Sequence, residues 1–265
     1  MTELITPGSS DAGLTQDLNL WVVDALCTEI GSARADAVYG SLAPIGDDLS
    51  DLLHGNRSTP QLSVTERQQI VDFAQTEALR LVAEGIVPNS VMFPVDVVSV
   101  ANNLGVCVKE MPIDVKTQNG NSIAGFIVKP ADQSCAVIFV ASTSDSNRKR
   151  SSISHELGHY VTWRREIPAD QWLSRQLMDI RSVEEGDTDP VQFCANSFMH
   201  KQLIPDYALA EKLQEGPSID ELSNVFGMSP DSVRRRMTYL SLVTQTYPAE
   251  YPVPSGLGHF EAASQ

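Results

Sequence analysis

The sequence predicts an α+β fold, in which a small, mostly antiparallel sheet packs against one helix and further helices flank it at both ends. Three short segments rich in β-branched and aromatic residues follow one another at residues 106–113, 122–128 and 135–141. Turn-forming Asn-Gly, Lys-Pro and Asp-Gln pairs separate these segments. Before and after them, apolar residues recur at the spacing of a helix.

The helices before the predicted strands are recognised by their ends. Ser63 and Glu66 have the spacing of a capping box, and apolar residues then recur every three or four positions up to Gly85. A shorter helix is expected from Pro94 to Gly105, because proline favours the first turn of a helix and glycine the position after its end.

Further helices are expected after the strands. Residues 151–166 (SSISHELGHYVTWRRE) carry an apolar stripe of helical period, and Asp189-Pro190 opens a helix that stops before Pro205. Two short helices with serine caps surround Gly227 and form a helix-turn-helix-like unit.

These signals divide the chain into four parts. Residues 1–62 form an N-terminal region to which no role can be assigned, and residues 63–210 form the main α+β domain. Residues 211–246 form a C-terminal helical unit, and the Pro- and Gly-rich tail at residues 247–265 is expected to be irregular.

Charge and composition narrow the class of protein. The formal net charge of −15 argues against the broad positive surface that supplies non-specific affinity for nucleic acid. No apolar run approaches the length that spans a membrane, and the N-terminus lacks the features of a signal peptide. The four cysteines show no CxxC spacing. We therefore expect a cytoplasmic protein that binds neither membranes nor, directly, nucleic acid.

The segment HELGH indicates a catalytic metal site. His155 and His159 are four residues apart on a predicted helix, so both rings lie on one face and can reach the same zinc ion at about 2 Å. Glu156 can take a proton from a zinc-activated water and pass it to the leaving amine of a peptide bond. The alternative is a chance match on an ordinary core helix.

Several motifs, in order, resemble the ImmA/IrrE family of cytoplasmic zinc metallopeptidases, which occur in phages and other mobile elements. NRKRSSISHELGH resembles the family's HExxH helix, and CANSFMHKQLIP resembles its later A-N-x-F-x-x-x-x-L-x-P helix. The strand pair before HELGH and the C-terminal helical unit also resemble the family, so the likeness covers about residues 63–242. It implies a zincin-like fold, a bound Zn²⁺ and cleavage of a helix-turn-helix transcriptional repressor.

One position departs from the family. The third zinc ligand is expected to be a glutamate three residues before the Ala-Asn pair, and this chain has Gln192 there. An amide oxygen can bind zinc but brings no charge, so Gln192→Glu should tighten zinc binding if the side chain faces the metal. Gln192 also fits a capping box with Asp189, in which case that substitution should change little. Carboxylates that could serve instead are Asp189, Glu184, Glu185 and Asp187.

Two more polar residues follow on the same helix. Asn196 could orient a zinc ligand or serve in packing. His200 lies two turns beyond Gln192 and is expected to be a solvated surface residue.

Three functions compete on these observations. The first is an active zinc endopeptidase that cleaves a repressor, with the acidic loop at residues 167–189 contacting the repressor's basic surface. The second is a degenerate zincin that binds the repressor without cutting it, although the retained Glu156 argues against this. The third is direct DNA binding through Arg234, Arg235 and Arg236 in the helix-turn-helix-like unit, which the overall acidity disfavours.

Overall fold

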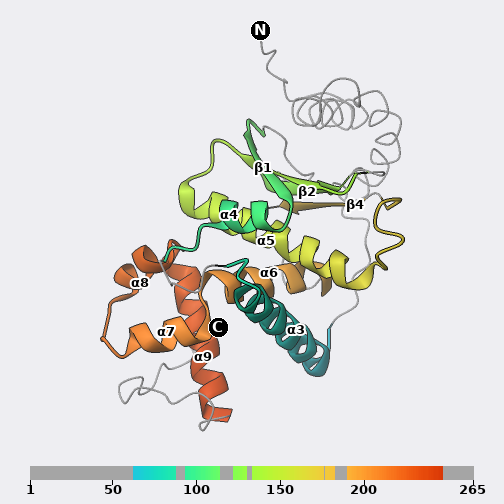
Figure 1. The fold of residues 1–265 in the computed structure, drawn as a ribbon. Coiled ribbons are helices and arrows are strands. Elements are labelled where there is room, and N and C mark those ends of the chain that lie inside the picture. Colours follow the sequence, from blue (N-terminus) through green and yellow to red (C-terminus); the bar gives the residue numbers. More distant parts are fainter. Residues whose placement is uncertain are drawn as a thin grey trace.

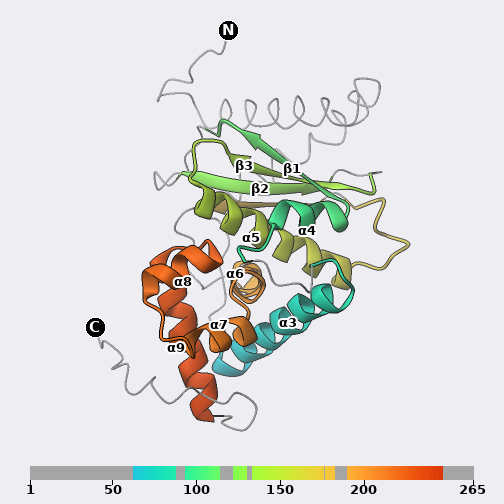
Figure 2. The same cartoon turned by 60° about the vertical axis from the view of Figure 1, so that its left-hand side comes forward.

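The computed structural model shows a sheet with helices stacked on one of its faces (Figures 1 and 2). The described residues are 62–87, 93–113, 122–129, 133–175, 177–182 and 190–246. The expectations for residues 1–61 and for the tail lie outside these ranges. Within them, no helix is long and apolar enough to cross a bilayer.

The sheet has four strands in the order β1-β3-β2-β4. Two of its pairings, β2 with β3 and β2 with β4, are antiparallel, and β1 runs parallel to β3. Every residue of β2 and β3 is buried, as expected for central strands. The predicted α+β class with a mostly antiparallel sheet is confirmed. The strands are β1 (Val106–Met111), β2 (Ile123–Lys129), β3 (Ala136–Ala141) and β4 (Leu177–Ser182).

The expectation that residues 167–189 form a loop is wrong for Leu177–Ser182. This segment is strand β4, which pairs with β2 so that Asp179 lies opposite Ile127. The sequence signal was present but short, since Met178 and Ile180 alternate with Asp179 and a following arginine. Neighbouring acidic residues obscured it.

Most helices form where their end signals predict them. Ser63 and Glu66 make both hydrogen bonds of the capping box at the start of α3, and Ser218 caps α8 with Glu221 in the same way. The helix predicted at residues 190–203 is α6, with the same bounds. HELGH lies on α5, and α9 is the last helix of the described residues. The bounds of these helices are α3 (Val64–Ala83), α5 (Ser146–Glu166), α6 (Pro190–Leu203), α8 (Ile219–Phe226) and α9 (Pro230–Thr246).

Two helices differ from the prediction. Helix α4 (Val97–Asn103) begins three residues after Pro94, because the Asp96 carboxylate accepts hydrogen bonds from the first backbone N–H groups and fixes the start there. Helix α7 (Asp206–Leu213) was not predicted, and it runs across the expected domain boundary at residue 210.

Helix α5, with α4 beside it, lies between the sheet and helices α3 and α6 (Figure 2). It contacts β2 and β3 on one side and α6 on the other, and all ten residues from 152 to 161 are buried. The helix centre is therefore covered all round rather than along a single stripe. Polar side chains on such a helix need partners within the protein.

The crossing of α5 and α6 is set by Gly158. A Cβ atom at this position would lie 2.8 Å from the Cα atom of Ala195, closer than side-chain contacts allow. The lack of a side chain at Gly158 is therefore what permits this close backbone packing. Because the backbones touch here, side chains one turn to either side on the two helices can meet.

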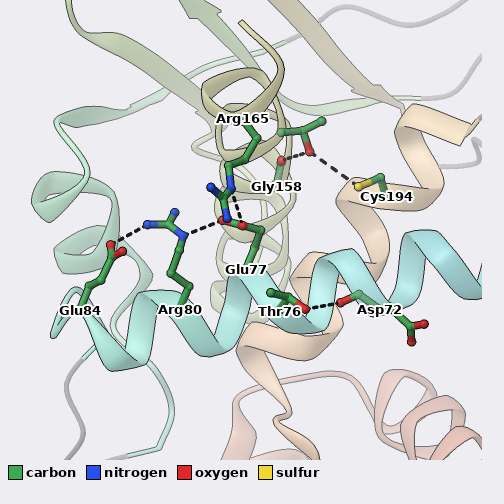
Figure 3. A network of polar contacts seen from close by, with 9 residues as sticks. Asp72, Thr76, Glu77, Arg80, Glu84, Gly158, Arg165 and Cys194 are labelled. Carbon is green, nitrogen blue, oxygen red and sulfur yellow. Dashed lines mark hydrogen bonds and ion pairs between the residues drawn. The ribbon is translucent and has the colours of Figure 1, made fainter. Parts of the chain in front are cut away.

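A buried carboxylate joins α3 to the end of α5 (Figure 3). Glu77 is 1% exposed and accepts hydrogen bonds from Arg165 (Nε–Oε1, 2.6 Å) and Arg80 (Nε–Oε2, 2.8 Å). Arg80 also pairs with Glu84. The pairing of Glu77 with Arg165 spans two helices, so it helps to fix α3 against the helix that carries HELGH.

We expect the Glu77–Arg165 pair to be energetically coupled. A double-mutant cycle with Glu77→Gln and Arg165→Met, measured by chemical denaturation, should give a coupling of about 1–2 kcal/mol, because a buried carboxylate depends on its cation. The exposed pair Asp231–Arg234 has the same 2.6 Å separation and serves as the control, with an expected coupling below about 0.5 kcal/mol. Equal couplings for the two pairs would contradict this assignment.

A second buried charge cluster joins α6, α7 and α9. The Asp206 carboxylate pairs with Lys201 (Nζ–Oδ2, 2.7 Å) and with Arg236, whose guanidinium also donates to the carbonyl oxygen of Ile204. Burial, followed by the charge of Arg236, lowers the pKa of Lys201 to about 8 despite the opposing effect of Asp206. Two cations therefore share one buried carboxylate.

This cluster predicts a specific dependence of stability on pH. Between the folded pKa of about 8 and the unfolded value of about 10.4, the unfolded chain binds a proton at Lys201 that the folded chain does not. From pH 8 to 10 the free energy of unfolding should therefore rise by about 1–2 kcal/mol relative to the Lys201→Met variant.

Urea unfolding of both proteins across this pH range checks the prediction. The Lys212→Met variant is the control. Glu215 raises rather than lowers the pKa of Lys212, so the free energy of unfolding of this variant should rise from pH 8 to 10 as that of the wild type does. Parallel pH curves for the wild type and Lys201→Met would contradict the low pKa of Lys201.

Candidate metal centre

The two histidines of HELGH meet on one face of α5. His155 and His159 are each 1% exposed, and their Nε2 atoms lie 3.1 Å apart. This is the convergence that the spacing of the two residues predicts. It places two ring nitrogens side by side inside the protein.

Helix α6 supplies an amide on each side of His155. Asn196 Oδ1 lies 2.9 Å from Nδ1, and Gln192 Oε1 lies 3.0 Å from Nε2. A carbonyl oxygen can only accept, so the contact with Asn196 suits the tautomer in which Nδ1 of His155 carries the hydrogen and donates it. In the neutral ring the lone pair is then on Nε2, which is the form that binds metals.

Strand β4 adds a carboxylate that was not predicted from the sequence. Asp179 is 4% exposed, and its Oδ1 atom accepts a 2.6 Å hydrogen bond from the Gln192 amide nitrogen. The same oxygen lies 3.5 Å from His159 Nε2. The pairing of β4 with β2 brings Asp179 to this position, so no local pattern around residue 179 could have indicated it.

The spacing of His155 Nε2 from its two neighbours is compatible with a shared metal ion. Four ligands about 2.0–2.1 Å from a tetrahedral zinc lie roughly 3.3 Å from one another. The separations here are 3.1 Å between the two histidine Nε2 atoms, and 3.0 Å between His155 Nε2 and Gln192 Oε1. Because Gln192 points its amide nitrogen at Asp179, two lone pairs face each other at that 3.0 Å contact. They repel unless a proton or a metal ion lies between them.

The position at which the family resemblance implies a third ligand holds an amide rather than a carboxylate. Within the described ranges, no three His, Cys, Asp or Glu side chains are arranged to hold a metal ion. Gln192 stands where the family resemblance places a glutamate, and its side chain does face His155. Asp189, the other half of the alternative capping box, lies outside the described residues, as do Glu184, Glu185 and Asp187.

Glu156 is fully buried, next to His155 on α5. His200 is half-buried rather than fully solvated, and it lies eight residues beyond Gln192, roughly 12 Å along the axis of α6. The Asn196 contact with His155 favours the orienting role over a role in packing alone. Of the candidate residues, the structure therefore brings together His155, His159, Gln192 and Asn196.

A separate apolar pocket of about 320 Å³ lies between α3, the segment before α4, and the α6–α7 turn. Ala78, Val82, Phe93, Pro205 and Tyr207 are among the residues that line it. None of the residues of the histidine cluster does. The chemistry of the cluster, rather than the size of a pocket, therefore identifies the candidate site.

The helix-turn-helix-like unit packs onto the rest of the protein. Arg236 is 4% exposed and bonded to Asp206, and Arg234 pairs with Asp231. At Gly227, between α8 and α9, an added Cβ atom would collide with Pro94 and Arg150. These contacts favour a structural role for the unit over DNA binding.

A buried helix with an HExxH motif, packed on a mixed sheet and crossed by a second helix that adds polar side chains, points to the metallopeptidases. A family model described as the IrrE N-terminal-like domain, Peptidase_M78, matches residues 101–238, just over half of the chain. The chain therefore belongs to this peptidase family, and the resemblance found in the sequence is confirmed. No curated protein matches the sequence significantly.

Proposed function

We propose that this chain is a zinc-dependent endopeptidase in which His155, His159 and Gln192 hold the metal and Glu156 is the general base. The observation that carries the proposal is the meeting of the two histidine Nε2 atoms with the Gln192 amide oxygen, at 3.0–3.1 Å, inside a member of a peptidase family. Membership of the family supports peptidase activity. The metal and the residue roles are the proposal.

Each residue of the site has a distinct task. A bound zinc ion supplies Lewis acidity toward water and toward the scissile carbonyl group. Glu156 accepts the proton of the attacking water and returns it to the leaving amine. Asn196 accepts from Nδ1 of His155, which keeps the lone pair of that ring on Nε2, toward Gln192 and His159.

We propose a helix-turn-helix transcriptional repressor as the substrate. The resemblance to the ImmA/IrrE family supports this choice, and the net charge of −15 suits a partner with a basic DNA-binding surface. The acidic residues 183–189, which could contact such a surface, lie outside the described ranges. Regulation would then follow from destruction of a DNA-binding protein.

Cleavage of a repressor is the direct test. The zinc-loaded full-length chain, incubated with the helix-turn-helix repressor encoded nearest to it, should produce a discrete fragment. Chelator and the Glu156→Gln variant should each suppress that fragment. If neither binding nor cleavage of the repressor occurs, the proposed substrate is wrong, and the peptidase chemistry must then be tested on other proteins.

The neutral third ligand favours a second candidate function. Gln192 brings no charge to the metal site, and a weakened site could serve to bind a repressor without cutting it. In that case, the same incubation should give a stable complex and no fragment at any zinc concentration.

A further inference from the structure

The pairing of β4 with β2 places Asp179 next to His159 and Gln192. Asp179 lies on β4, opposite Ile127 of β2, and its side chain points to the helices that carry the metal site. One carboxylate oxygen contacts both sides of that site, at 2.6 Å from Gln192 Nε2 and 3.5 Å from His159 Nε2. Asp179 therefore touches one residue from each of the two helices.

The contact with Asp179 decides which way the Gln192 amide points. An amide can be turned over so that its oxygen and nitrogen exchange places, with little change in shape. A carboxylate only accepts hydrogen bonds, so the Gln192 nitrogen must face Asp179 and its oxygen must face His155. Without Asp179, the nitrogen could turn toward His155 Nε2, and the oxygen would be lost as a ligand.

Asp179 also brings a negative charge next to Gln192 and His159. A buried carboxylate needs a compensating positive charge, and among the described residues the ionisable group paired with Asp179 is His159. A divalent cation beside the two Nε2 atoms would complete this compensation. A hydrogen bond to an anion also draws the amide electrons toward the Gln192 oxygen, which strengthens that oxygen as a ligand.

We propose that Asp179 and Gln192 together replace the missing carboxylate ligand. Gln192 provides the oxygen that faces the metal, while Asp179 orients that oxygen and carries the negative charge one residue further out. Asp179 is thus a positioning residue for the metal site. The proposal rests on the proposed metal-dependent function, and it explains how a glutamine can stand at the third position without leaving the site neutral.

The test is a double-mutant cycle on zinc affinity, measured on the full chain by competition with a chromophoric chelator. Asp179→Asn should weaken zinc binding by about 10–100-fold, because the orienting acceptor and the charge are both lost. Gln192→Glu adds a charged ligand but places it against the Asp179 carboxylate, 2.6 Å from the atom it replaces, so it should gain less zinc affinity than it would without that neighbour. In the Asp179→Asn/Gln192→Glu variant, Glu supplies the charge directly and the Asn amide can donate to it, so zinc affinity should return to at least the wild-type value.

The cycle separates this role from a merely structural one. Asp231→Asn, which removes an exposed carboxylate on α9, is the charge control and should leave zinc affinity unchanged. If Asp179→Asn fails to fold, the comparison of Gln192→Glu with the double variant decides. The double variant should bind zinc at least as tightly as Gln192→Glu, because Asn at position 179 donates to the new carboxylate whereas Asp179 repels it, and weaker binding by the double variant would contradict the proposal.

Three results would overturn the proposal. An Asp179→Asn variant that binds zinc like the wild type would show that Asp179 is dispensable. A double variant that stays as weak as Asp179→Asn would show that Asp179 only supports the fold. A wild-type chain that binds no zinc would reject the proposed metal function itself, and the proposal with it, whereas the first two results leave that function standing.

Discussion

The Glu156→Gln variant is expected to cleave its substrate at least about a hundredfold more slowly than the wild type, because proton transfer by a positioned carboxylate contributes about 10²–10⁴ to such rates. The substitution keeps the size of the side chain and removes its basicity. Zinc affinity should stay within about threefold of the wild type, since Glu156 is assigned no role as a ligand. Single-turnover cleavage and a chelator titration measure the two quantities on the same preparation.

A matched control is available on the same helix. Glu166, the last residue of α5, is exposed, so Glu166→Gln removes a charge from the helix without entering the site. This variant should cleave at the wild-type rate. A Glu156→Gln protein that cleaves as fast as Glu166→Gln would show that another group acts as the base.

Removal of either histidine is expected to weaken zinc binding at least about a thousandfold. His155→Ala leaves one histidine and an amide, and His159→Ala leaves the other histidine with the same amide, which is too few ligands for a stable tetrahedral site. His200→Ala is the control, because His200 is assigned no role as a ligand and lies roughly 12 Å from Gln192 along the axis of α6. Competition titration should rank His200→Ala with the wild type, and comparable affinities for all four proteins would place the metal elsewhere.

Local signals account for the parts of the fold that the sequence predicts well. The capping boxes at Ser63 and Ser218 define the starts of α3 and α8, and the bounds of α6 follow from Pro190 and Pro205. A cap is decided by residues three positions apart, so its signal survives whatever the tertiary surroundings. The start of α4 was misplaced because Asp96 offers a better cap than a proline-led first turn.

Non-local contacts account for what was missed. Strand β4 is six residues long, and it becomes a strand by pairing with β2, about fifty positions earlier in the chain. Burial of α5 on all sides depends on the sheet and α6 together, whereas the sequence showed a single apolar stripe. Such pairings leave only weak traces in the local pattern.

The candidate site likewise has a part that local sequence predicts and a part that only the fold shows. The convergence of His155 and His159 follows from helical geometry alone, and the orientation of Gln192 toward them was one of two alternatives left open by the sequence. The contact between Asp179 and Gln192 joins a strand to a helix across residues with no regular spacing. Only the folded chain shows that a carboxylate contacts the neutral side chain of Gln192.

Metal content tests the central claim most directly. The wild-type chain and His155→Ala should be loaded with zinc, freed of excess metal by gel filtration, and analysed by elemental mass spectrometry. We expect about one zinc per wild-type chain and less than roughly a tenth of that in His155→Ala, because a tetrahedral site that loses a histidine does not retain its metal. A wild-type chain without zinc, or equal zinc in both proteins, would contradict the assignment of HELGH as a metal site.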